Sequence, residues 1–325
     1  MLNQGIALER GGELNEASAV YRKVWEAAKD NGTSALNLAR TLVAVGKNAE
    51  ASAVLKETVS EGDHDAGLLN ALASTLRYEK KYKEAVETAR KVILRDQQNV
   101  SAIKTLALIY ADEGKLVLAE NSYRYAMKLA PKDASIRTNL GLLAYRQGKV
   151  QDALLQFDEA LKLDPGSATV LANIGSIALS FRAYKRAAKS YEKALKGGMV
   201  NCTTMTGYGY ALEGLQKGKE AVAQLTKALK LCPSDHDILY SMGRICMEQL
   251  RDNTCAIEQF EKYKNTKPGL ASEDPVHNLL ESLKDMVGDG GESAPAEDGK
   301  GEATGAADGS GAGASTQPAI ETKRA

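Results

Sequence analysis

The feature that most constrains this chain is a sequence pattern that recurs every 34 residues. One position of the pattern is always small, at Gly5, Ala39, Ala73, Ala107, Gly141, Gly175, Gly209 and Gly243. A second small position follows, at Ala17, Ala51, Ala85, Ala119, Ala153, Ala187, Ala221 and, after one inserted residue, Ala256. Four residues later the position is mostly bulky, at Tyr21, Leu55, Tyr123, Phe157, Tyr191, Leu225 and Phe260, with Ala89 as the exception. A period of about 20 to 50 residues is typical of stacked copies of one supersecondary unit.

Each recurring residue type has a task in a pair of antiparallel helices. Apolar residues at three- and four-residue spacing predict two amphipathic helices in each copy. The small residues let the two helix backbones approach closely, and the bulky residue fills the space beside them. Proline cannot continue a helix and therefore ends several copies, at Pro131, Pro165, Pro233 and Pro268. Glycines that suit a turn with positive φ lie between the two halves, at Gly12, Gly46, Gly114 and Gly148.

In this pattern the chain resembles the tetratricopeptide repeat (TPR) family, from residue 1 to about residue 270. The resemblance implies an all-α fold, a right-handed superhelix of helix-turn-helix units, or α-solenoid. The eight expected units are 1–31, 32–65, 66–99, 100–133, 134–167, 168–201, 202–235 and 236–270. The first unit begins three residues late, so either the natural chain extends upstream or its start is frayed. The eighth unit contains the inserted residue.

The C-terminal part of the sequence differs from the repeats. Residues 271–288 have an amphipathic pattern, which predicts the capping helix that a solenoid needs over its last apolar face. Residues 289–325 are rich in Gly and Ala and carry a net charge of −4, from seven acidic and three basic residues. Such a segment cannot bury enough apolar surface to offset its ordering entropy, so we expect a disordered acidic tail.

Composition excludes several classes of function. The chain has 42 basic and 42 acidic residues, so no global positive charge favours nucleic acid. No apolar run approaches the roughly 20 residues of a transmembrane helix, and the N-terminal sequence is not that of a signal peptide. Membrane attachment is expected only through a lipid anchor upstream of this sequence. We find no catalytic triad, phosphate-binding glycine loop or paired-carboxylate site, and we expect no enzyme activity, cofactor or metal.

The four cysteines lie in the last two repeats, at Cys202, Cys232, Cys246 and Cys255. Antiparallel helix pairing places Cys202 near Cys232, and Cys246 near Cys255. Each pair could form a disulfide; buried free thiols and a zinc site are the alternatives. Disulfides would indicate an oxidising compartment such as a periplasm, whereas free thiols would favour the cytoplasm.

In the TPR family the first helices of successive units line a concave groove that binds a peptide or a partner's helix. The resemblance assigns to this groove a partial row of asparagines and several aromatic or basic residues: Asn37, Arg40, Arg77, Lys104, Asn139, Tyr145, Arg146, Asn173, Tyr210, Tyr240 and Arg244. Asparagine can both donate to and accept from a peptide backbone, and Tyr and Arg often dominate binding energy. Asn173, Tyr210, Tyr240 and Arg244 form the preferred binding centre.

The function implied by the resemblance is binding of protein partners. We expect a non-enzymatic scaffold that helps to assemble or hold a multiprotein complex. If the protein is exported, it would be similar to TPR proteins and lipoproteins of bacterial envelope machines, such as those of pilus assembly or gliding motility. Two alternatives are a substrate-recruiting TPR arm of a larger enzyme and a cytosolic chaperone adaptor or regulator.

Overall fold

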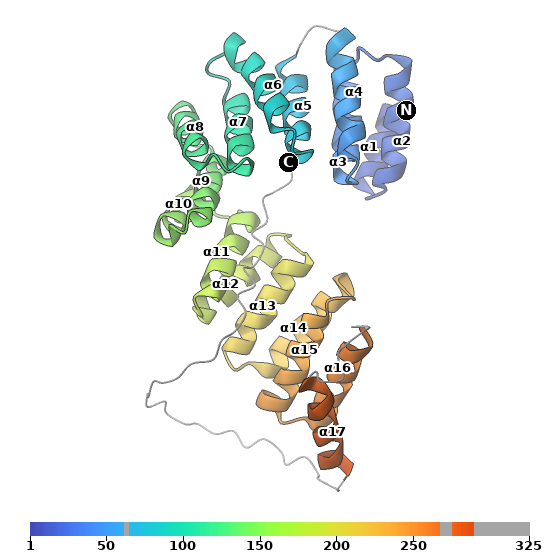
Figure 1. Cartoon of the computed structure of the whole chain (residues 1–325), viewed down its shortest axis with the longest axis vertical. Helices are drawn as coiled ribbons and strands as arrows, with labels where there is room; N and C mark the ends of the chain where they lie inside the picture. The colour runs from blue at the N-terminus through green and yellow to red at the C-terminus, as the bar shows by residue number, and fades with distance from the viewer. Residues whose placement is uncertain (62–64, 267–274, 289–325) are drawn as a thin grey trace. The chain divides into compact units, whose positions relative to one another are not determined.

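The computed structural model of the protein describes residues 1–61, 65–266 and 275–288, and the expected tail of residues 289–325 lies outside them. The chain divides into unit 1, Met1–Leu163, and unit 2, which begins at Asp164. The helices of unit 1 are α1 (Leu2–Arg10), α2 (Leu14–Ala27), α3 (Gly32–Ala44), α4 (Asn48–Glu61), α5 (Ala66–Tyr78), α6 (Tyr82–Arg95), α7 (Val100–Asp112), α8 (Leu116–Leu129), α9 (Ala134–Arg146) and α10 (Val150–Leu163). Within unit 1 these helices form successive antiparallel pairs (Figure 1).

Unit 2 continues the same helical pairing. Its helices are α11 (Ala168–Ser180), α12 (Tyr184–Lys196), α13 (Cys202–Gly214), α14 (Gly218–Leu231), α15 (His236–Ile245), η1 (Cys246–Leu250), α16 (Asn253–Thr266) and α17 (Pro275–Gly288). The odd-numbered helices up to α15 are the first helices of the repeats, and the even-numbered helices are the second helices. First helices of adjacent repeats contact each other directly: α3 contacts α5, α5 contacts α7 and α11 contacts α13. The chain is therefore an all-α solenoid of stacked hairpins.

The residue before most first helices is an N-cap that also repeats every 34 residues. Asn31, Asp65, Asn99, Asp133, Asn201 and Asp235 each accept a hydrogen bond from a backbone N–H in the first turn. An N-cap side chain satisfies one of the four N–H groups that a helix start leaves without partners. The next helix begins one residue later, at residues 32, 66, 100, 134, 202 and 236, which are the first residues of expected repeats.

The turn inside each hairpin contains one residue with positive φ. Four of these residues in unit 1 are glycines, as predicted, with φ between 75° and 83°. Lys80 holds the same place in unit 1, and Arg182, Gln216 and Arg251 hold it in unit 2, with φ between 53° and 60°. A left-handed conformation costs a residue with a Cβ about 1–2 kcal/mol. The turn is therefore set by the hairpin as a whole and not by glycine alone.

The small and bulky positions of the repeat pack against each other across each hairpin. A Cβ added to Gly141 would lie 2.6 Å from Cε1 of Phe157, and a Cβ added to Gly243 would lie 2.6 Å from Cε1 of Phe260. Phe157 and Phe260 are fully buried. The predicted pairing of a small residue with a bulky one is confirmed, because nothing larger than hydrogen fits where the ring lies.

The inserted residue of the eighth repeat is accommodated by a π-helix. Helix α15 continues into η1, a five-residue π-helical segment, and Arg251 then closes the turn with φ of 53°. A π-helix places one extra residue in a helical turn, so the insertion leaves the following α16 in register. Beyond α16, Val276, Leu280 and Leu283 of α17 pack into the same apolar cluster as Phe260. Helix α17 thus covers the end of the solenoid, while residues 271–274 of the expected cap lie outside the described residues.

Candidate protein-interaction surfaces

The predicted groove residues lie on the first helices. We call the side that carries Asn37, Arg77, Lys104 and Arg146 the first-helix face of unit 1. The side that carries Asn173, Tyr210 and Arg244 is the first-helix face of unit 2.

The asparagine row is not uniform. Asn37 is half-buried, and its Oδ1 accepts a hydrogen bond of 3.2 Å from Arg40. Asn139 is also half-buried. Asn173 is only 3% exposed, and its buried Nδ2 has no hydrogen-bond partner. A buried amide without a partner is unfavourable by about 1–3 kcal/mol. The Asn173 nitrogen is such an unsatisfied donor, and it lies beneath the surface of the face of unit 2.

Every predicted basic residue on the face of unit 1 forms an ion pair with an acidic residue. Arg40 contacts Glu9 at 2.8 Å, across from α3 to α1. Asp112 at the end of α7 contacts two arginines, Arg77 of α5 at 2.6 Å and Arg146 of α9 at 3.3 Å. These arginines therefore link neighbouring repeats. Arg40 and Arg146 are also exposed, whereas the Arg77 side chain is only 10% exposed.

Lys104 forms an ion pair with Asp133, the N-cap residue of α9. Its Nζ lies 2.8 Å from Asp133 and 3.0 Å from the Ser135 hydroxyl. The other carboxylate oxygen of Asp133 accepts from the Ser135 backbone N–H at 2.9 Å, at the start of α9. Burial alone would raise the pKa of Asp133, but the hydrogen bonds from Lys104 and Ser135 outweigh it and hold the pKa below its usual value. Lys104 is thus tied to the structure of the next repeat.

Tyrosines from two second helices reach the charged groups of this face. The Tyr21 hydroxyl donates to Glu9 at 3.1 Å, beside Arg40, and burial together with Glu9 raises the pKa of Tyr21. Burial also raises the pKa of Tyr123, while the nearby Arg77 and Arg146 act in the opposite direction. Tyr21 therefore hydrogen-bonds to the acid of one ion pair between first helices, while the pKa of Tyr123 is affected by the charges of another.

The face of unit 2 has the opposite arrangement of charge. Arg244 of α15 contacts Glu213 of α13 and also Glu248, the latter at 3.4 Å. Burial raises the pKa of Glu213, Arg244 lowers it, and Glu248 raises it further. Here one arginine lies between two carboxylates, whereas in unit 1 one carboxylate lies between two arginines.

The aromatic residues of the preferred binding centre have different surroundings. Tyr240 is 40% exposed, and its ring lies 5.8 Å from that of Phe260 and 5.6 Å from that of Tyr263 on α16. Tyr210 is half-buried; burial raises its pKa to about 12, against the effect of the neighbouring Ser241 hydroxyl. On unit 1, Tyr145 is also half-buried. Tyr240 is therefore an exposed aromatic side chain on a rigid aromatic support.

The structure joins the cysteines in the two predicted pairs. Cys202, the first residue of α13, is bonded to Cys232 at the end of α14, with an S–S distance of 2.01 Å. Cys246, the first residue of η1, is bonded to Cys255 in the first turn of α16, at 2.05 Å. Among the described residues, one group of metal-ligand atoms lies within 4.8 Å of one another, and it combines the first pair with Asp235.

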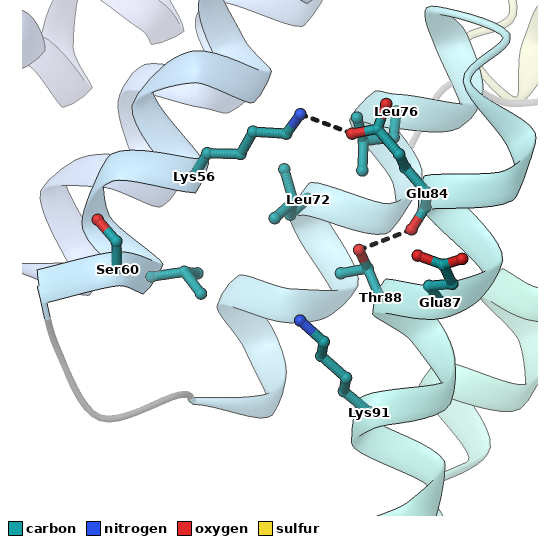
Figure 2. Close-up of a pocket in the computed structure, with 9 residues that line it drawn as sticks. Lys56, Ser60, Leu72, Leu76, Glu84, Glu87, Thr88 and Lys91 are labelled. Atoms are coloured by element: carbon teal, nitrogen blue, oxygen red, sulfur yellow. Dashed lines mark hydrogen bonds and ion pairs between the residues drawn. The ribbon is translucent and has the colours of Figure 1, made fainter.

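The second helices of unit 1 form another charged surface. Ion pairs between residues 28 positions apart join consecutive repeats on this surface: Arg22–Glu50 at 2.6 Å, Lys29–Glu57 at 2.5 Å and Lys56–Glu84 at 2.7 Å. Lys29 lies in the turn that follows α2, and the other five residues lie on second helices. Figure 2 shows Lys56 and Glu84 bridging the edge of a hollow of about 390 Å³ between α4, α5 and α6. Leu72 and Leu76 of α5 also line this hollow.

Sequence reasoning found the basic residues of the two faces but not their acidic partners. Glu9, Asp112 and Glu213 each follow an alanine or leucine on a first helix and carry no distinctive local pattern. A usable signal was present in the spacing, because Glu9–Arg40 and Glu213–Arg244 are both separated by 31 residues. The acid occupies the same position of the repeat in both pairs, and the arginine occupies a second, common position in the next repeat.

Comparison with known families decides the classification. Three tetratricopeptide repeat profiles match the chain, at residues 10–75, at 66–99, and at 104–168 and 138–200. Together these matches cover more than half of the chain. The chain belongs to the tetratricopeptide repeat family. TPR proteins generally mediate protein–protein interactions and the assembly of complexes. The more specific likeness to pilus-assembly or gliding-motility proteins stays a hypothesis.

Solved TPR structures share this fold at low sequence identity. A chain of the APC/C hetero-tetramer Cut9–Hcn1 aligns with 83% of this chain and 52% of its own length, with a TM-score of 0.58 and 18% identity. Yeast Tom70 aligns with 84% of this chain and 59% of its own, with a TM-score of 0.55 and 17% identity. The chain thus spans between half and three fifths of these two structures. A search of curated proteins found no match. None of the described helices has the length and apolar character needed to cross a membrane.

Proposed function

We propose that this TPR protein is a non-enzymatic scaffold whose first-helix faces bind an extended segment or a helix of partner proteins. Tyr240 carries this proposal. It is a large aromatic side chain with 40% of its surface exposed, and Phe260 and Tyr263 hold it in place. A rigid aromatic residue loses little conformational entropy on binding, and such residues often dominate interface energy.

Polar groups on the same faces support the proposal. Asn37 and Asn139 are partly exposed at equivalent places in two repeats, and each amide can pair with a peptide backbone. The amide nitrogen of Asn173 has no partner, but it is buried, so a bound segment cannot reach it and we assign it no part in the affinity. The basic residues, by contrast, already have acidic partners, so we assign the affinity mainly to aromatic and amide groups.

The test is site-specific photo-crosslinking in native lysate. A photoreactive residue is placed at Asn139 or Tyr240 on the first helices, and at Lys128 or Lys227 on the second helices as matched controls. Both lysines are exposed. We expect crosslinked partners from the first pair of positions only. Crosslinks confined to the lysine positions would contradict the proposal.

A second measurement uses the partner that the crosslinks identify. Tyr240→Ala should weaken its binding by roughly 2 kcal/mol, whereas Tyr240→Phe keeps the ring and should retain most of the affinity. Equal affinity for Tyr240→Ala and the unaltered protein, with thermal stability also unchanged, would place the interface elsewhere.

We also propose that the protein works in an oxidising compartment. Both cysteine pairs are bonded, and disulfides persist where thiols are not kept reduced. A thiol count under denaturing conditions, on protein taken from its native cells, should find no free thiol. Four free thiols would reject this compartment.

A further inference from the structure

The first-helix face of unit 1 contains a triad in which charge is not balanced. The Asp112 carboxylate contacts the guanidinium groups of both Arg77 and Arg146, at 2.6 and 3.3 Å. Two positive charges therefore share one negative charge. Nearby acids already have lysine partners, since Glu79 pairs with Lys81 and Glu113 pairs with Lys115, each at 2.7 Å.

The two arginines of the triad are not equivalent. The Arg77 side chain is 10% exposed, lies 4.5 Å from the Tyr78 ring centroid and makes the shorter contact with Asp112. Arg146 has 41% of its side chain exposed and makes the longer contact. Arg77 is therefore fixed, whereas Arg146 can turn its guanidinium toward a group in solvent while Asp112 stays neutralised by Arg77.

We propose that the Arg77–Asp112–Arg146 triad is a subsite for an acidic side chain, Asp or Glu, of a bound partner segment. A carboxylate matches the fork of a guanidinium and forms charge-assisted hydrogen bonds with it. It would also supply the negative charge that the triad lacks. This inference rests on the proposed function, because it specifies the partner chemistry of one first-helix face.

Unit 2 provides a contrast in charge. Its triad, Glu213–Arg244–Glu248, has one arginine between two carboxylates and an excess of negative charge, so an acidic segment should be repelled there. The matched control variant is Arg124→Ala on the second helix α8, because Arg124 is exposed and pairs with Glu120 at 2.8 Å. Loss of Arg124 should leave the binding of an acidic segment unchanged, while loss of Arg146 should reduce it.

The experiment measures fluorescence anisotropy with the full-length protein and a labelled peptide with blocked termini, in which Glu alternates with Ser. The comparison peptide has Gln in place of Glu. We expect the Glu peptide to bind more tightly and its affinity to fall as salt is added. Arg146→Ala should weaken binding about tenfold, the equivalent of one charge-assisted hydrogen bond, and Arg146→Lys should weaken it less.

Asp112→Asn reverses the expected direction, because it frees both arginines and should strengthen binding of the Glu peptide. Circular dichroism and thermal melting show whether each variant folds. Equal binding of the Glu and Gln peptides, or an Arg146→Ala variant that is folded and binds normally, would overturn the proposal. If first-helix crosslinks to partners are nevertheless found, only the acidic subsite fails and the scaffold function stands.

Discussion

Units 1 and 2 have the same repeat and the same hairpins, but different devices hold them together. Unit 1 contains no cysteine, and three ion pairs, each between residues 28 positions apart, join its consecutive repeats on the second-helix side. Unit 2 contains both disulfides, and glycines in α13 let side chains of neighbouring helices approach very closely. One repeat pattern therefore specifies the arrangement of helices but leaves open how adjacent helices are fastened.

Reduction of the disulfides should produce the largest difference between the units. The Cys202–Cys232 bond closes a loop of 30 residues and the Cys246–Cys255 bond a loop of 9. The chain-entropy relation gives about 3–4 kcal/mol for the longer loop and about 2–3 kcal/mol for the shorter one. Cys202→Ser with Cys232→Ser should thus lower the free energy of unfolding of unit 2. Hydrogen exchange of α13 and α14, compared with α3 and α4, measures it; equal acceleration in both units would contradict the comparison.

Close packing in α13 should give the next largest effect. A Cβ added at Gly209 would lie 2.5 Å from Leu225, which is fully buried. Gly209→Ala should therefore destabilise unit 2 by about 1–3 kcal/mol through overpacking, despite the better helix propensity of alanine. Gly166→Ala is the matched control, since its nearest neighbouring atom would be 3.8 Å away. Denaturant unfolding should separate the two variants, and a stable Gly209→Ala protein would disprove the close approach.

Glycine in a hairpin turn of unit 2 should stabilise the protein, whereas the two preceding changes should destabilise it. Arg182 and Gln216 of unit 2 have positive φ where most turns of unit 1 have glycine. Arg182→Gly should remove a left-handed penalty of about 1–2 kcal/mol from the folded state. Glycine loses more chain entropy on folding, which offsets part of this gain, so the free energy of unfolding should rise by about 0.5–1 kcal/mol. Gly46→Ala in unit 1 should lose a similar amount. Thermal melts of both variants would show it; a loss for Arg182→Gly would mean that its side chain stabilises the turn.

Two glutamates should give the smallest effect, with opposite dependence on pH. The pKa of Glu84 in unit 1 is lowered by the hydrogen bond from Lys56, so its stabilisation is present above its ordinary value of 4.5 and is lost as pH falls through the lowered pKa. The pKa of Glu213 in unit 2 is raised by burial, so its stabilisation is present at low pH and is lost as pH rises. As pH rises from about 4 to about 7, Glu84→Gln should become less stable relative to the unaltered protein, and Glu213→Gln should become more stable. Denaturant unfolding at both pH values tests the two signs.

The sequence predicts much of the fold because each repeat position has a local task. The positions of Gly141 and Phe157 predict a hairpin from side-chain volume alone, and the cysteine pairs follow from antiparallel pairing of two helices. The site was harder to predict. Whether Arg77 and Arg146 meet the same acid depends on the rotation between three successive repeats, which no single repeat encodes. For the π-helix at Cys246–Leu250, the only indication in the sequence was one inserted residue in the repeat.

The proposed function requires that partners bind the first-helix faces, and side-chain footprinting of a native complex measures this binding site directly. Hydroxyl radicals oxidise accessible aromatic and aliphatic side chains, so Tyr145 and Tyr240 report on the first helices, while Tyr125 and Leu155 report on the second. Tyr125 and Leu155 are 44% and 56% exposed in the free protein. We predict that a bound partner protects Tyr145, Tyr240 or both, and leaves Tyr125 and Leu155 reactive. Protection of Tyr125 and Leu155 alone would contradict the proposed function.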